Sequence, residues 1–138
     1  MLRPNQRKYR KSNKGKLNSS YETKANQLQF GIIGLQSLEK GRITARQIEA
    51  VRRSLAGFTK RKSKTWIRIF PDFPVSKKPT EVRMGRGKGN VSHWVSIVKP
   101  GRILYEMAGS DVILLKAALK NASVKLPVST RIIERQLF

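Results

Sequence analysis

The 138-residue chain contains no cysteine and a single histidine, His93. Without thiols it can form no disulfide, thiolate metal site or cysteine nucleophile, and one histidine offers little for a metal cluster or a Ser-His-acid triad. The eight acidic residues are spread singly, so no paired carboxylates indicate metal-assisted phosphoryl chemistry. No apolar run reaches the roughly 18 residues of a membrane span. We therefore expect no enzyme activity, no metal or other cofactor, and no membrane span.

Acidic residues are also few relative to basic ones. Thirty Lys and Arg residues stand against eight Asp and Glu, which gives a formal net charge of +22. Solubility alone needs a net charge of only about 2–8 in magnitude, so the excess indicates a polyanionic partner. Binding to anionic lipid would need a helix with opposed apolar and basic faces, whereas here the charges are scattered over a tail, a helix and loops. Nucleic acid is therefore the expected partner.

The sequence predicts that residues 1–26 form a basic N-terminal tail. No acid precedes Glu22 and apolar residues are sparse, so the segment cannot order itself alone and is expected to order against phosphates. Tyr9 is available to stack on a base. A mitochondrial transit peptide is the rival interpretation, but Pro4 and the polar run 10–16 give no amphipathic helix. Residues 27–138, with enough apolar content for a core, are expected to form a single domain.

Periodicity within this domain predicts two helices and five strands. Alternation over 28–32 predicts a strand, and Thr44 with Gln47 fits a capping box that starts a helix at about Ala45, which Gly57 can end. A second helix is expected after Ser110 or Asp111, with a buried stripe made by Val112, Leu115, Ala118, Leu119, Ala122 and Leu126. Further strands are expected at 66–70, 94–98, 102–107 and 128–133, followed by a frayed tail.

Two features of these strands bear on the predicted architecture. The strands 94–98 and 102–107 flank the turn Pro100-Gly101 and are expected to form a hairpin. Trp66 and Trp94 each open an apolar strand and are interpreted as core anchors. The order of elements predicts the α+β class: a compact two-layer sandwich of mixed or antiparallel sheet with two helices and a basic N-terminal tail.

A glycine-rich basic loop is the strongest candidate for function. Gly85, Gly87 and Gly89 alternate with Arg86 and Lys88, so backbone amides could approach an anion closely. The loop is neither a P-loop nor a dinucleotide-binding fingerprint, since it leads into a strand and not a helix. A flexible surface turn is the alternative. RNA phosphates would relieve the repulsion between the cations that are crowded at the tip of this turn.

The sequence is compatible with more than one kind of nucleic-acid-binding protein. No helix-turn-helix, zinc finger, zipper or aromatic RNP signature is present, and dispersed charge suits an irregular folded RNA read by shape and backbone. A free nucleic-acid chaperone or DNA-compacting protein is the main alternative. An RNA-processing enzyme using His93 and Lys88 is a third.

Ordered blocks across nearly the whole chain resemble a known family. They include Met1-Leu2-x-Pro4, the stretch 41–50, the stretch 64–72, the stretch 81–90 and the stretch 99–107. On these residues the chain resembles the L-sixteen family of large-subunit ribosomal proteins. The resemblance implies a fold of the α/β-hammerhead type and a non-catalytic role in the large subunit, near the base of the central protuberance. It also implies binding of large-subunit rRNA beside the aminoacyl-tRNA site and support of subunit assembly.

The resemblance and the charge pattern together give candidate site residues. The implied partners are large-subunit rRNA, tRNA in the aminoacyl site and neighbouring ribosomal proteins, and no homo-oligomer is expected. The loop expected near tRNA and the peptidyl-transferase centre comprises Arg83, Met84, Gly85, Arg86, Gly87, Lys88, Gly89 and Asn90. The expected rRNA-binding residues are Arg3, Arg7, Lys8, Tyr9, Arg10, Lys11, Lys14, Lys16, Arg42, Arg46, Arg52, Arg53, Lys60, Arg61, Lys62 and Lys64.

Departures from the family pattern bear on where the protein works. The stretch 17–22 is less basic and glycine-rich than is usual in the family, and Ser92-His93 replaces a commoner acidic-aromatic pair. Such drift toward Asn, Ser, Lys and Ile resembles an organellar protein. A start at the family's first residue, with no presequence, suggests synthesis inside the organelle. The expected location is the mitochondrial ribosome, with a plastid or the bacterial cytoplasm as alternatives.

Overall fold

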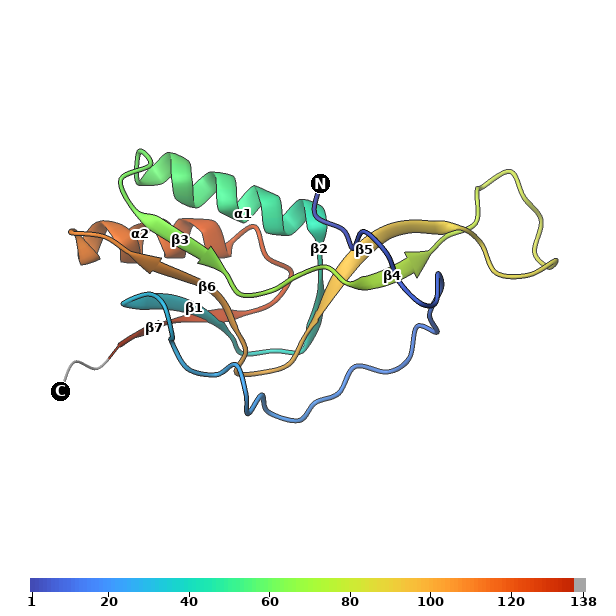
Figure 1. Ribbon diagram of the computed structural model, residues 1–138, viewed down its shortest axis with the longest axis horizontal. Coiled ribbons are helices and arrows are strands. Elements are labelled where there is room, and N and C mark those ends of the chain that lie inside the picture. Colours follow the sequence, from blue (N-terminus) through green and yellow to red (C-terminus); the bar gives the residue numbers. More distant parts are fainter. Residues whose placement is uncertain (136–138) are drawn as a thin grey trace.

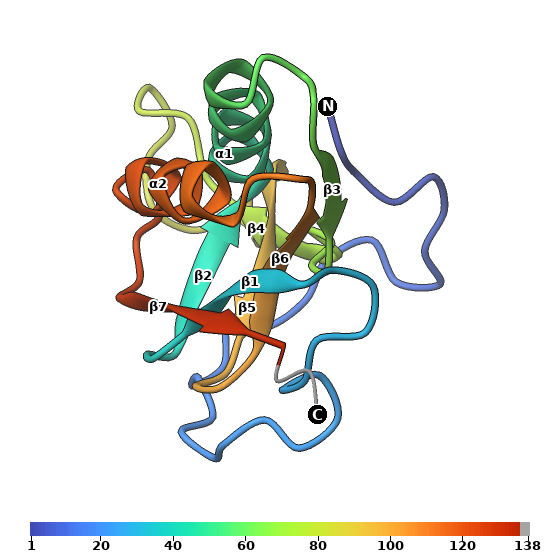
Figure 2. The same ribbon diagram turned by 90° about the vertical axis from the view of Figure 1, so that its left-hand side faces the viewer.

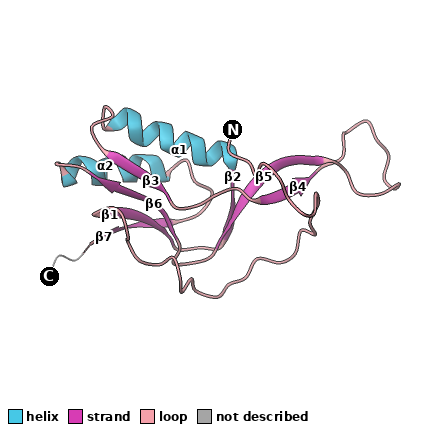
Figure 3. Ribbon diagram, in the orientation of Figure 1, coloured by secondary structure: helices cyan, strands magenta, loops and turns pink. Residues whose placement is uncertain are grey.

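The structure is a computed structural model that describes residues 1–135 (Figure 1). Two helices, α1 (Ala45–Phe58) and α2 (Val112–Ser123), accompany seven strands within that range (Figure 3). The strands are β1 (Ile33–Ser37), β2 (Gly41–Thr44), β3 (Lys64–Ile67), β4 (Phe73–Ser76), β5 (Val91–Val98), β6 (Ile103–Ala108) and β7 (Thr130–Glu134). They form two antiparallel sheets, ordered β3-β6-β1-β7 and β2-β5-β4. The predicted α+β class is confirmed.

The hydrophobic core lies between the four-stranded sheet and the two helices, which pack side by side on one of its faces (Figure 2). Ile33 and Leu35 of β1 and Tyr105 of β6 are fully or almost fully buried there. The Tyr105 hydroxyl donates to the Ile48 carbonyl oxygen at 3.1 Å, and burial raises the pKa of this phenol far above its ordinary value. This layer provides a rigid base for the smaller sheet.

The smaller sheet carries the segment of functional interest. Strands β4 and β5 form an antiparallel hairpin whose long loop, residues 77–90, extends from the end of the molecule opposite α2 and β7 (Figure 1). At the base of this loop β4 is an edge strand beside β5, and the N-terminal segment contacts the loop and the residue before β4. The glycine-rich loop thus lies away from the hydrophobic core.

Both helices begin where the sequence predicts. Thr44 caps α1: its side chain accepts from Gln47 N at 3.2 Å, while Gln47 Oε1 accepts from Thr44 N at 2.9 Å. Ala45, Ile48, Val51 and Leu55, which recur at helical spacing, are buried. Asp111 caps α2 and accepts from Leu114 N. Of the stripe predicted on α2, Val112 is 37% exposed in the first turn, and Leu126 lies beyond the end of the helix at Ser123.

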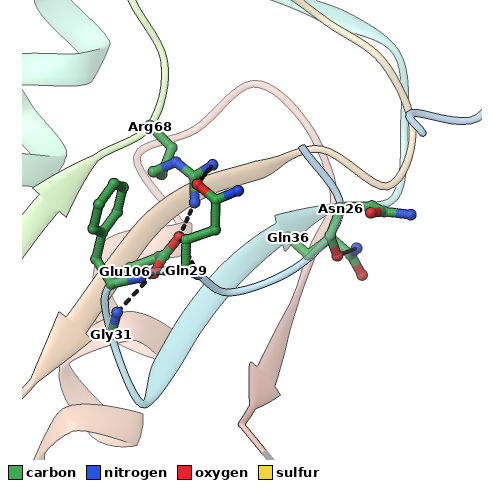
Figure 4. A network of polar contacts seen from close by, with 7 residues as sticks. Asn26, Gln29, Gly31, Gln36, Arg68 and Glu106 are labelled. Atoms are coloured by element: carbon green, nitrogen blue, oxygen red, sulfur yellow. Dashed lines mark hydrogen bonds and ion pairs between the residues drawn. The ribbon is translucent and has the colours of Figure 1, made fainter. Parts of the chain in front are cut away.

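The prediction of a strand at 28–32 is wrong, because β1 begins only at Ile33. The backbone amides of Gln29, Phe30 and Gly31 do not join a ladder; they donate to the carboxylate of Glu106, at 2.7 Å from Phe30 and from Gly31 (Figure 4). This buried carboxylate also pairs with Arg68. Residues 29–31 are therefore held by a side chain, and backbone pairing with β6 starts only at Ile32, whose amide donates to the Met107 carbonyl oxygen.

The predicted hairpin between 94–98 and 102–107 is also wrong, although both strands exist. Strand β5 pairs with β2 and β4, whereas β6 pairs with β1 and β3, so the turn at Gly101 passes from one sheet to the other. Ser37 donates to the Arg102 carbonyl oxygen and accepts from Gly101 N, and Ile103 N donates to the Ala25 carbonyl oxygen. These bonds use the backbone groups that a hairpin would need.

Other predictions differ in detail. Strands β2 and β4 were not predicted, the first because it is only four residues long and the second because Pro74 lies within it. Pro74 is tolerated because β4 is at an edge. Neither Trp66 nor Trp94 belongs to the buried core; both are half-buried. Strand β7 extends to Glu134, and residues 136–138 of the predicted tail lie outside the described residues.

Candidate nucleic-acid interface

The N-terminal arm, residues 1–26, has no helix or strand and lies along the outside of the fold (Figure 1). Its last residues are fixed to the body, since Glu22 N donates to the Pro100 carbonyl oxygen at 2.8 Å. The Glu22 carboxylate lies 3.3 Å from Arg102. Burial raises the pKa of Glu22, but the Lys24 amide and the positive charge of Arg102 outweigh it, and the pKa is lowered overall.

The first half of the arm lies against the β4–β5 hairpin. The Arg7 guanidinium donates to the Asp72 carbonyl oxygen at 2.8 Å and lies over the Trp94 ring, 5.8 Å from its centroid. A cation over an indole face is a favourable contact. Trp94 thus serves as a support for the arm, a role that sequence analysis missed because nothing in the local sequence links it to Arg7.

Two reciprocal hydrogen bonds join the arm to the glycine-rich loop. Lys11 Nζ donates to the Lys88 carbonyl oxygen at 3.0 Å, and Lys88 Nζ donates to the Ser12 carbonyl oxygen at 2.5 Å. The two basic segments, which are far apart in sequence, therefore form one continuous cationic surface. Each lysine bonds to a backbone carbonyl and not to a carboxylate, so its full positive charge is retained.

Arg42, predicted to bind RNA, has a second role. Its guanidinium donates to the Lys14 carbonyl oxygen at 2.7 Å and to the Gly15 carbonyl oxygen at 3.2 Å, and the side chain is half-buried. It therefore tethers the arm to β2. Gly15, with a φ of +60°, turns the chain at this point.

The loop itself is exposed throughout residues 79–88. Gly85, Arg86 and Gly87 have φ angles of +109°, +55° and +91°, so three consecutive residues adopt left-handed backbone conformations. A Cβ at Gly85 or Gly87 would meet no atom within 4 Å. These two glycines are therefore required by the path of the backbone and not by crowding, and they present Arg83, Arg86 and the fully exposed Met84 outward.

The remaining predicted residues lie elsewhere. Exposed Arg46 is in the first turn of α1, whereas Lys60, Arg61, Lys62 and Lys64 gather at the α1–β3 turn, at the end of α1 away from the β4–β5 loop (Figure 1). Arg52 and Arg53 contact Glu49 at 2.6 Å and 3.1 Å, and their hydrogen bonds lower the pKa of Glu49 to about 2. The predicted set is thus divided between two regions.

Four of the eight acidic residues form ion pairs within the described part of the fold. Among the described residues, ion pairs join Glu22 to Arg102, Glu49 to two arginines, Glu106 to Arg68 and Glu134 to Lys116. These pairs involve five of the thirty basic side chains. The arm (residues 1–26) and the loop (residues 77–90) carry thirteen of the thirty basic residues against two acidic ones, so their outer surface is complementary to a polyanion.

Residues 1–135 contain no group of three His, Cys, Asp or Glu side chains that could hold a metal ion. Within the same range, no helix combines the length and the apolar character needed to cross a membrane. His93 is exposed, and its Nδ1 lies 3.4 Å from Ser92 Oγ, a long and local contact. In the described part of the chain no carboxylate hydrogen-bonds to this ring, so the geometry gives no support to an RNA-processing enzyme that uses His93 and Lys88.

This arrangement defines a class of protein: a small α+β scaffold that displays a basic arm and a basic hairpin loop on one continuous surface. The model of the ribosomal protein L16p/L10e family matches residues 4–133, and the chain belongs to that family. It is accordingly a ribosomal protein of the large subunit, in a family whose role is structural rather than catalytic.

Proposed function

We propose that the chain binds large-subunit rRNA through the continuous surface made by the N-terminal arm and the β4–β5 loop. The observation that carries this proposal is the reciprocal pair of bonds between Lys11 and Lys88, which holds the two basic segments together before any RNA binds. Preorganised cations lose less conformational freedom on binding. Phosphates can also displace the backbone carbonyls as partners of these lysines.

The β4–β5 loop is the part of this surface that would face tRNA in the aminoacyl site. It extends farthest from the hydrophobic core (Figure 1), and its tip exposes Arg83, Met84 and Arg86. Because the tip contacts little of its own protein, it can enter a space between RNA segments without disturbing the core. The cations of the α1–β3 turn form a second contact with rRNA in this proposal.

Binding of a large-subunit rRNA fragment, measured in competition with random duplex DNA, tests the proposal. The double variant R83E/R86E should weaken rRNA binding by about tenfold or more, since it replaces two cations at a phosphate surface by two anions. Its circular dichroism should be unchanged, because both side chains are exposed. The matched control K120E/K125E makes the same charge change on the α2 side of the molecule and should weaken binding less.

The same competition addresses the second candidate function. A free chaperone or DNA-compacting protein would bind duplex DNA and rRNA equally well. R83E/R86E and K120E/K125E would then each weaken the binding of DNA and of rRNA to the same extent. Preference for rRNA supports a ribosomal role. Equal affinity contradicts it.

The proposed location is the mitochondrial ribosome. Support comes from the polar stretch 17–22 and from Ser92-His93, both of which depart from the family pattern. Fractionation of cells with an antibody to this chain should place it with mitochondrial large subunits. Recovery with plastid or cytoplasmic ribosomes would contradict the organelle assignment and leave the rRNA-binding proposal intact.

A further inference from the structure

A small cavity lies where the N-terminal arm crosses the three-stranded sheet. In the register of this sheet, Thr44 of β2 lies opposite Val95 of β5, which lies opposite Phe73 of β4. Cross-strand partners point to the same face, and all three side chains line a cavity of about 240 Å³. Val75 and His93 form the next such pair along the hairpin and line the cavity as well.

An irregularity in β4 adds a polar group to this wall. The register shifts between Val75 and Ser76, and such a bulge re-aims the side chain that follows it. All four residues of β4 line the cavity, and Ser76, which follows the shift, is the one that carries a hydroxyl group.

The arm and the glycine-rich loop close the cavity from above. Ser12 and Lys14 of the arm and Lys88 of the loop line it. The bonds from Lys88 to the Ser12 carbonyl oxygen and from Arg42 to the Lys14 carbonyl oxygen hold this cover in place. The cavity therefore has an apolar floor, built by Phe73, Pro74, Val75 and Val95, and a cationic rim.

Two polar atoms of the cavity wall lack partners. Arg42 Nε and Ser76 Oγ are buried and make no hydrogen bond within the described residues. Buried polar groups are normally satisfied, because an unpaired donor or acceptor loses its water without compensation. Both residues line the cavity, so a ligand bound there would lie close to two unsatisfied polar groups.

We propose that this cavity binds the base of a single unpaired RNA nucleotide, whose phosphate lies at the rim beside Lys14 and Lys88. A base is flat and apolar on its faces and polar at its edge, which matches an apolar floor with Arg42 and Ser76 in the wall. A bare phosphate would find no donors on the floor. The volume is below the roughly 300–1,000 Å³ of pockets for drug-sized ligands and suits one base.

This inference rests on the proposed rRNA binding and adds a specific point of recognition to it. The first experiment uses the whole chain and follows the methyl NMR signals of Val95 during titration. The probes are the 5′-monophosphates of adenosine, guanosine, cytidine and uridine, with ribose 5-phosphate as the probe that lacks a base. The nucleotides should shift these signals and ribose 5-phosphate should not. Equal shifts, or none with any probe, would overturn the inference.

The second experiment fills the cavity. The variant V75W should weaken binding of an rRNA fragment with unpaired loops by about tenfold, the order expected for loss of one base contact. Its affinity for a fully paired RNA duplex should be unchanged. The control variant I113W adds the same bulk at a side chain that is 81% exposed on α2 and should change neither affinity.

A milder variant covers the case in which V75W does not fold. S76A removes an unpaired hydroxyl, so it should not lower the free energy of unfolding, yet it should weaken the nucleotide-induced shifts. Wild-type protein that binds neither RNA contradicts the proposed function itself. If the wild-type protein binds loop-containing RNA no more tightly than V75W and S76A do, this result contradicts only the base-binding cavity.

Discussion

At the scale of single residues, Glu106 is the buried charge on which the local structure depends most. Its carboxylate is fully buried, accepts from three consecutive backbone amides and pairs with Arg68, whose side chain is 13% exposed (Figure 4). Burial raises the pKa of Glu106, but the amides of Gly31 and Phe30 and the Arg68 guanidinium outweigh it and lower the pKa overall. The segment before β1 is thus fixed by one side chain.

We predict that E106Q lowers the free energy of unfolding by about 3 kcal/mol. The amide group keeps one acceptor oxygen but directs an NH₂ group toward buried donors and leaves Arg68 without its counter-charge. Urea denaturation measures the difference. The control E81Q changes an exposed carboxylate of the loop and should alter stability little; equal losses in the two variants would contradict the role of Glu106.

The same residue predicts a pH dependence. Since the folded pKa of Glu106 is lowered, its contribution is present above the unfolded value of about 4.3 and is lost as pH falls through the folded value. Glu22 and Glu49, the latter with a pKa of about 2, act in the same direction. The free energy of unfolding should therefore fall below about pH 4.5, and less steeply in E106Q than in wild type. Parallel curves would contradict this assignment.

At the scale of elements, the capping box of α1 lends itself to a direct test. We predict that T44A lowers the free energy of unfolding by about 1 kcal/mol, because Gln47 N loses its acceptor at the start of the helix. Thermal or urea denaturation measures this loss. T23A, at an exposed position of the arm, is the matched control. A loss no larger than that of the control would show that the cap contributes nothing.

The elements also show how far the sequence could be interpreted. Helices and buried stripes were predictable because capping residues and 3.6-residue periodicity are local signals. The partners of the strands were not predictable. The sequences of β5 and β6 are typical of a hairpin, but Ser37 and Ala25, which are distant in sequence, form the hydrogen bonds around Gly101. Likewise the segment 28–32 alternates like a strand, but the carboxylate that holds it comes from β6.

The candidate site was predictable in composition but not in arrangement. Charge and glycine spacing alone singled out the arm and the loop. Their contact through Lys11 and Lys88, the tethering role of Arg42 and the cavity beneath the arm depend on long-range packing. No local pattern encodes such contacts, so sequence analysis missed them.

At the scale of the whole molecule, the net charge of +22 predicts strongly salt-dependent RNA binding. If six to ten phosphates are contacted, the affinity for an rRNA fragment should fall by about 10³- to 10⁵-fold between 50 and 200 mM salt. Filter binding over this range measures the slope. A shallow dependence would mean that the exposed cations of the arm and loop do not face phosphates.

The most direct test of the central claim is sedimentation of ribosomes through a high-salt sucrose cushion, followed by immunodetection of this chain. The account predicts that the protein remains with the large subunits, in about one copy per subunit, because arm, loop and cavity bind folded rRNA together. Recovery of the chain chiefly in the salt-washed supernatant, or outside ribosomes altogether, would contradict it.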